Sequence, residues 1–137
     1  ELNKECVRDV LIKCEQLLKM NDDGSMNTLN SNSLKEALPN YDISILKYTV
    51  LKLKEAELLN VSIIKADSSL VYKFVIFDIT YQGHEFLEQI KNDNNWKKVK
   101  DIAKNVGSFS IDVLKQIAIS VIANQINNYC RWGKENG

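Results

Sequence analysis

The sequence predicts an α+β fold in which a helix-turn-helix is followed by a β-hairpin and then by further helices. Two long stretches, 2–20 and 43–58, repeat apolar residues at helical spacing, and a short helix closed by Pro39 lies between them. The segment 61–79 changes to a pattern rich in β-branched and aromatic residues, which is typical of strands. With 137 residues, 45% of them hydrophobic, the chain suits one globular domain.

The first third of the chain predicts two helices and a tight turn. The helix over 2–20 is amphipathic and ends at the polar turn 21–25. The short helix spans 33–38, because Pro39 cannot continue it. Asp42 then stands where an N-cap would begin the next helix. A short helix and a tight turn ahead of a longer helix are typical of a helix-turn-helix.

The next segment predicts a long helix followed directly by a hairpin. Four apolar residues of the helix 43–58 should face the core because they fall within one narrow arc. They are Ile43, Leu46, Val50 and Leu53. The hairpin spans 61–79 and turns at 67–69. This order predicts a winged helix-turn-helix over residues 1–80, with 43–58 as its recognition-type helix and 61–79 as its wing.

The remaining residues, 81–137, predict a C-terminal helical extension that packs on the wing domain in one folding unit. Its helices span about 81–92, 96–105 and 110–129. The last helix has no charge over 116–130, but polar residues interrupt its apolar stripe, so a membrane span is not predicted. The stripe predicts either a central core helix or a helix buried in a homodimer. Its residues are Ile111, Leu114, Ile117, Val121, Ile122 and Ile126.

Two local motifs resemble those of known DNA-binding proteins. The run 53–59 resembles the L-x-x-A-G-L-I end of recognition helices in winged-helix proteins, with Glu57 where glycine usually stands. A glycine supplies a left-handed C-cap at little cost, so the exit from this helix is expected to differ by a residue. The run 79–87 resembles the L-T-x-x-G-x-x-x-L segment of MarR-like and PadR-like regulators. This resemblance implies that a strand ends here, that Thr80 caps a helix, and that Gly83 lets this helix pack closely.

A closer resemblance covers nearly the whole chain. It rests on the segment 78–90 with its T-x-x-G-H-E-F-L core, on 96–100 with its tryptophan, on 3–11 and on the charge-poor last helix. Together these segments resemble a family of small, uncharacterised proteins of low-GC bacteria and their prophages, which is labelled only as a domain of unknown function. The resemblance implies a winged-helix-like fold and a phage or mobile-element setting. It brings no catalytic or binding residues to this chain.

The residues do not predict an enzyme, a metal site or a cofactor. His84 is the only histidine, and Glu88 replaces the second histidine of an H-E-x-x-H zinc motif. A structural or capping role is therefore expected for His84. No phosphate-binding glycine loop or nucleophile motif occurs. The cysteines, Cys6, Cys14 and Cys130, are expected to be free thiols in a reducing cytoplasm.

Candidate DNA contacts lie on the predicted recognition helix and on the wing. The chain has 18 basic and 18 acidic residues, a balance that argues against a strongly basic nucleic-acid coat protein. Lysines contact phosphates, and the first residues of a recognition helix contact bases. The candidates are Ser44, Lys47, Tyr48, Lys52 and Lys54 on the helix, with Lys65 and Lys73 on the wing.

Three interpretations of this helix stay open. It has no arginine, although arginine bound to guanine is the commonest specific contact, and Glu55 and Glu57 lower its charge. Tyr48 and Leu51 suit a protein partner equally well, and the face could be merely solvated. The first hypothesis is a small, cytoplasmic, non-enzymatic regulator from a phage or prophage that binds duplex DNA. The second is a winged-helix module that binds a host or phage protein without DNA.

Overall fold

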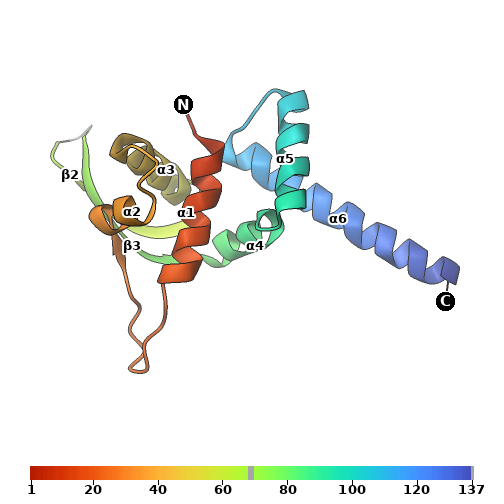
Figure 1. Cartoon of the computed structure of the whole chain (residues 1–137), viewed down its shortest axis with the longest axis horizontal. Coiled ribbons are helices and arrows are strands. Elements are labelled where there is room, and N and C mark those ends of the chain that lie inside the picture. The colour runs from red at the N-terminus through yellow and green to blue at the C-terminus, as the bar shows by residue number, and fades with distance from the viewer. Residues whose placement is uncertain (68–69, 137) are drawn as a thin grey trace. The chain divides into compact units, whose positions relative to one another are not determined.

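The computed structural model describes residues 1–67 and 70–136, which form six helices and a three-stranded antiparallel sheet (Figure 1). The predicted α+β class is confirmed. The chain divides into two compact units, Glu1–Leu87 and Glu88–Gly137. The boundary between them lies within helix α4 (Tyr81–Ile90) rather than in a linker.

The N-terminal unit begins with helix α1 (Lys4–Leu17). Asn3 caps this helix, because its side-chain oxygen accepts a hydrogen bond from the backbone N–H of Cys6 (3.0 Å). The helix ends at Leu17 rather than at residue 20, because the chain turns into a narrow ribbon in which Met20 pairs with Met26. The ribbon leads to strand β1 (Leu29–Asn30), which the sequence did not predict, since two residues show no alternation.

Helices α2 (Ser31–Ala37) and α3 (Ile43–Glu55) form the predicted pair with a tight turn between them. α2 begins at Ser31 rather than at residue 33, because Asn30 caps it and accepts a hydrogen bond from the backbone N–H of Ser33 (2.8 Å). Asp42 occupies the N-cap position of α3, as predicted, although its side chain makes no capping hydrogen bond. α3 packs on both α1 and α2.

Helix α3 ends at Glu55 rather than at residue 58, and a Schellman turn explains the difference. Glu57 has a φ of 62°, the left-handed conformation that glycine adopts at lower cost. The backbone N–H of Leu58 donates to the Leu53 carbonyl (2.9 Å), and the N–H of Glu57 donates to the Lys54 carbonyl (2.9 Å). Glu57 therefore takes the place and the conformation of the glycine that ends similar helices.

Strands β2 (Leu59–Lys65) and β3 (Val71–Ile79) form the predicted hairpin, which starts at Leu59 rather than at residue 61. Part of its predicted turn, residues 68–69, lies outside the described residues. β1 pairs with the other edge of β3, with Leu29 opposite Ile76. The order across the sheet is therefore β1-β3-β2.

The core of the N-terminal unit lies where α1, α3 and the sheet meet. The predicted core residues Leu46, Val50 and Leu53 of α3 are fully buried, as is Phe74 of β3. The same prediction was wrong for Ile43, which is 37% exposed. Ile43 lies in the first turn of α3, where it lines a surface hollow instead of the core.

The C-terminal unit holds helix α5 (Asp93–Val106) packed against helix α6 (Ile111–Asn136). α5 begins at Asp93 rather than at residue 96, because Asn92 caps it through the backbone N–H of Asn95 (3.0 Å). Gly107 ends α5 in the left-handed conformation, with a φ of 88°. α6 continues beyond the predicted end at residue 129.

The predicted apolar stripe of α6 is only partly core. Ile122 is half-buried and Ile126 is 57% exposed, while the other four residues are buried. Those four are Ile111, Leu114, Ile117 and Val121. Every residue from 123 to 131 is exposed. None of the helices in the described ranges has the length and hydropathy that a bilayer span requires.

Candidate nucleic-acid interface

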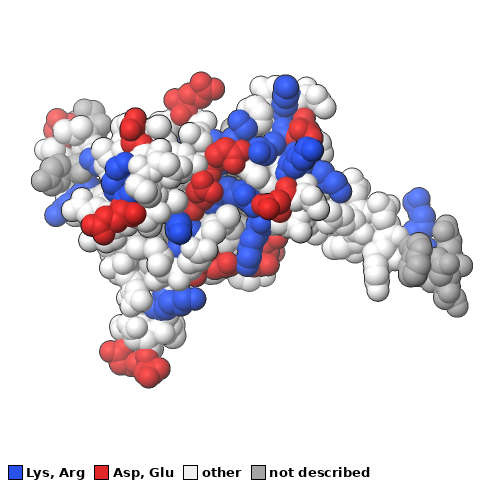
Figure 2. Space-filling model, viewed as in Figure 1, with Lys and Arg blue, Asp and Glu red and all other residues white. Residues whose placement is uncertain are grey.

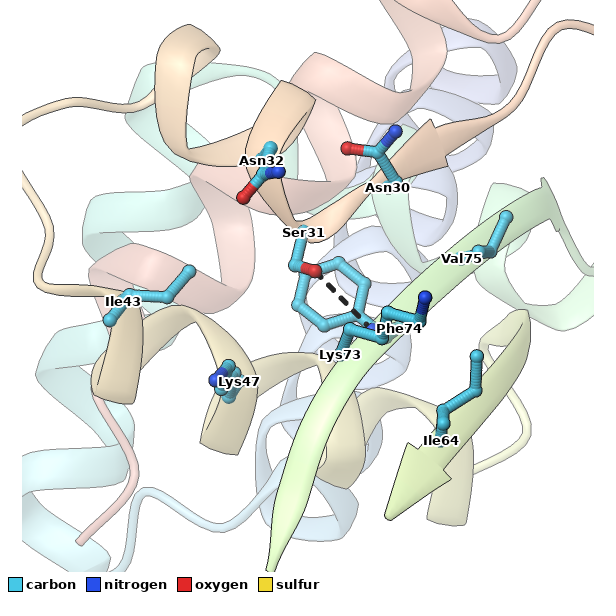
Figure 3. A pocket seen from close by; sticks show the side chains of 9 residues that line it. All are labelled: Asn30, Ser31, Asn32, Ile43, Lys47, Ile64, Lys73, Phe74 and Val75. Atoms are coloured by element: carbon cyan, nitrogen blue, oxygen red, sulfur yellow. Dashed lines mark hydrogen bonds between the residues drawn. The ribbon is translucent and has the colours of Figure 1, made fainter. Parts of the chain in front are cut away.

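A hollow of about 510 Å³ opens on the N-terminal unit between the start of α2, the first half of α3 and the β-hairpin (Figure 3). The side chains that line it come from three parts of the chain (Figure 3). This lysine hollow is lined by Asn30, Ser31, Asn32, Ile43, Lys47, Ile64, Lys73, Phe74 and Val75.

Asn30 and Ser31 hold the start of α2 against β3. Asn30 pairs with Val75 in the sheet, and its side chain caps α2. The buried Ser31 hydroxyl oxygen accepts a hydrogen bond of 3.4 Å from the backbone N–H of Phe74, drawn as a dashed line in Figure 3. One wall of the lysine hollow is therefore tied to the other by a strand pair and a side-chain hydrogen bond.

Two of the seven predicted DNA-contacting residues meet in the lysine hollow. Lys47 comes from α3 and Lys73 from β3. None of the described residues that line the hollow is acidic, so no carboxylate in its wall offsets the two ammonium charges. Asn30 and Asn32 add amide groups, which commonly bind phosphate oxygens and sugars. The arrangement suits the binding of an anion.

Two further candidates lie in a second hollow of about 510 Å³ between α3 and β2. Lys54 and Lys65 both line it, but so does Glu55, which lowers its net positive charge. Its other lining residues are Leu51, Val61, Ser62 and Ile63. The second hollow therefore suits an anion less well than the lysine hollow.

The remaining candidates lie on the surface of α3. The Lys52 ammonium is 2.8 Å from the Glu55 carboxylate and 5.4 Å from the centre of the Tyr48 ring. The hydrogen bond to Glu55 raises the pKa of Lys52. Ser44 is exposed in the first turn of α3. Six of the seven candidates are thus divided between two hollows and one charge-neutral cluster, and Ser44 lies apart from all three. Figure 2 shows acidic and basic side chains interspersed on the visible face.

The polar residues at the start of α2, namely Asn30, Ser31 and Asn32, were not predicted as part of a site. A usable signal was present, because an asparagine three positions before Ser33 is typical of a helix N-cap. An exposed apolar patch around Tyr48, Leu51 and Leu58 would favour a protein partner, but only part of it is exposed. Tyr48 is 39% exposed, but Leu58 is completely buried.

His84 lies exposed on α4, and its expected structural or capping role stays a prediction. Among the described residues, no group of three or more histidine, cysteine, aspartate or glutamate side chains is placed to hold a metal ion.

The three cysteines are free thiols, as expected, and only their burial differs. Burial raises the pKa of Cys6 to about 11 and that of Cys14 to about 12, whereas Cys130 is exposed on α6.

We expect the thiol reagent DTNB at about pH 8 to modify Cys130 in the native protein, and Cys6 and Cys14 only after unfolding, because buried protonated thiols are poor nucleophiles. The amount of coloured thiolate that DTNB releases per chain should rise threefold when guanidinium unfolds the protein. Cys130→Ser is the control, and rapid labelling of that native variant would contradict the burial.

Comparison with known proteins identifies relatives at the level of a family. An uncharacterized protein of Haemophilus influenzae is 26% identical over 125 residues, which cover 90% of this chain and 97% of that protein. No solved structure gives a significant match. The family model described as Hypothetical protein (DUF2513) matches residues 1–110. The chain therefore belongs to the DUF2513 family, in agreement with the expected domain of unknown function.

Proposed function

We propose that this protein is a non-enzymatic regulator that binds duplex DNA through a winged helix-turn-helix. The order of its elements supports this fold, since a short strand precedes α2 and α3 and a hairpin follows them. In the proposed complex α3 enters the major groove, with Ser44 and Tyr48 of its first half toward the bases. The β-hairpin then lies along the flanking backbone as the wing.

The lysine hollow is the observation that carries the proposal. Lys47 on the recognition helix and Lys73 on the wing line one hollow without a carboxylate in its described wall. A phosphate bound there would contact both lysines, and the amides of Asn30 and Asn32 would donate further hydrogen bonds. One backbone phosphate would thus fix α3 and the wing on the duplex together.

Charge reversal in the lysine hollow tests the proposal. Binding of the full chain to duplex DNA should weaken steeply with salt, because each phosphate contact releases counterions. The variant Lys47→Glu with Lys73→Glu should bind at least about tenfold more weakly, and the slope of log K against log salt should fall by about 2. Fluorescence anisotropy over a salt series measures both quantities.

The matched control for this test is Lys97→Glu with Lys98→Glu on α5. Both of these lysines are exposed, and the change in net charge is the same. The control variant should keep most of the affinity and the slope of the native protein. Equal losses in the two variants, or no salt-dependent binding by the native chain, would refute the proposed site.

A second candidate function is a winged-helix module that binds a host or phage protein. The neutral cluster of Lys52, Glu55 and Tyr48 favours it, because charges that are already paired add little to phosphate binding. Tyr48 and Ile43 are also exposed on α3 by 39% and 37%. A native chain that ignores DNA at low salt, while Tyr48→Ala abolishes capture of a specific protein, would favour this second function.

A further inference from the structure

We propose that α6 pairs with α6 of a second copy of this chain in an antiparallel helix pair. The contact is made by a stripe of four side chains, Ile119, Ile122, Ile126 and Tyr129, called the outer stripe. This inference concerns the C-terminal unit alone and does not depend on DNA binding.

The outer stripe is apolar, exposed and helical in its spacing. Ile119, Ile126 and Tyr129 are 55%, 57% and 76% exposed, and Ile122 is half-buried. The steps of three, four and three residues place all four on one side of the helix, as in the seam of a coiled coil. At about 100° per residue, this side is turned by roughly a third of a circle from the face that holds the buried residues Ile117 and Val121. α6 thus has two apolar faces, and only one is covered.

The length of α6 leaves this face without a partner in its own unit. α5 has 14 residues and α6 has 26, so α5 is only about half as long. From residue 123 to residue 131 every side chain of α6 is exposed. α5 therefore cannot cover the outer stripe along its length.

The charges of α6 indicate what covers the stripe. No residue between 116 and 130 is charged. A partner that carried charges to this surface would have to desolvate them without a counter-charge, which is costly. A second α6 presents the same neutral surface of isoleucine, serine, asparagine and glutamine. Its apolar side chains bury one another, and its amides can hydrogen-bond at the edges of the contact. A second copy is thus the complementary occupant.

The helix dipoles select the direction. A parallel pair would set two like-directed dipoles side by side, which is unfavourable. An antiparallel pair centred between Ile122 and Ile126 sets the two dipoles in opposite directions.

Two double variants with the same added charge test the interface. Ile119→Lys with Ile126→Lys places lysines on the outer stripe, whereas Ser120→Lys with Asn127→Lys places them on another exposed side of the same helix. We expect the native chain and the second variant to be dimers by sedimentation equilibrium, and the first variant to be a monomer with unchanged helical circular dichroism. A monomeric native chain, a dimeric first variant or equal loss of dimer in both variants would overturn the proposal.

The direction of pairing is tested with the exposed thiol of Cys130. A nitroxide attached there reports the distance between two copies, while Cys6 and Cys14 stay buried. The antiparallel pair places the two Cys130 positions about 18 Å apart along the helix axis, from the rise of 1.5 Å per residue. A dipolar electron resonance measurement should find that separation enlarged by the label arms. Labels in direct contact would indicate a parallel pair and overturn the proposal.

Discussion

Replacing Gly83 by alanine is expected to lower the free energy of unfolding of the N-terminal unit by about 3 kcal/mol. The added Cβ would lie 2.1 Å from the backbone oxygen of Leu58 and 2.6 Å from Cγ2 of Ile79. Both distances are far below van der Waals contact, and the first is to backbone. The start of α4 would therefore have to move away from the end of α3.

That movement is energetically costly, because it would break hydrogen bonds at the same junction. The Thr80 hydroxyl donates to the Glu57 carbonyl (2.7 Å) and accepts from the backbone N–H of Gly83 (3.0 Å). The backbone N–H of Thr80 donates to the Leu58 carbonyl (3.1 Å). This is the close packing that the resemblance of 79–87 to a segment of MarR-like and PadR-like regulators implies.

Urea unfolding followed by circular dichroism measures the effect, and Glu57→Gly is its control at the same junction. Glu57→Gly relieves a left-handed glutamate, so it should raise the free energy of unfolding by about 0.5–1 kcal/mol, partly offset by the flexibility of glycine in the unfolded chain. The two variants should shift the midpoint in opposite directions. An unchanged midpoint for Gly83→Ala would contradict the close approach of α4 to Leu58.

Truncation of Phe74 to alanine is expected to cost about 3–5 kcal/mol of stability. Phe74 is completely buried and is among the largest fully buried side chains of the chain's described part. Its removal loses the transfer energy of the ring and leaves a cavity that the sheet and helices around it can only partly close.

Phe77 provides the matched control on the same strand, since it is 40% exposed. Phe77→Ala should cost less than about 1 kcal/mol, because its ring buries much less surface on folding. Urea midpoints of the two variants give the comparison directly. Equal midpoints would mean that Phe74 does not occupy the core of the N-terminal unit.

The sequence predicted the helices and strands that are long enough to repeat the apolar spacing typical of their type. α3 was predictable because Leu46, Val50 and Leu53 recur within one arc, and all three are buried. Its end was predicted three residues too late, because Glu57 adopts a left-handed conformation that glutamate rarely adopts. β1 was also missed, since a strand of two residues is defined by its partner β3 and not by its own pattern.

The candidate site was predicted as single residues but not as an arrangement. Lys47 and Lys73 were both named, yet their meeting depends on how α3 packs beside the hairpin, which no local pattern contains. The pairing of Lys52 with Glu55 could have been anticipated, since residues three apart on a helix are neighbours. The position of Asn30 and Asn32 depends on where α2 begins, which the N-cap pattern at Asn30 could have indicated.

The two-residue length of β1 has a consequence for local unfolding. β2 and β3 are close in sequence, whereas Leu29 must meet Ile76 across a long stretch of chain, so β1 joins an existing hairpin only after a larger loss of loop entropy. Few hydrogen bonds then hold β1 in place, and such segments open locally at a free energy below that of global unfolding. Because Asn30 begins α2 directly after β1, each local opening releases one wall of the lysine hollow while the core of α1, α3 and the hairpin stays folded.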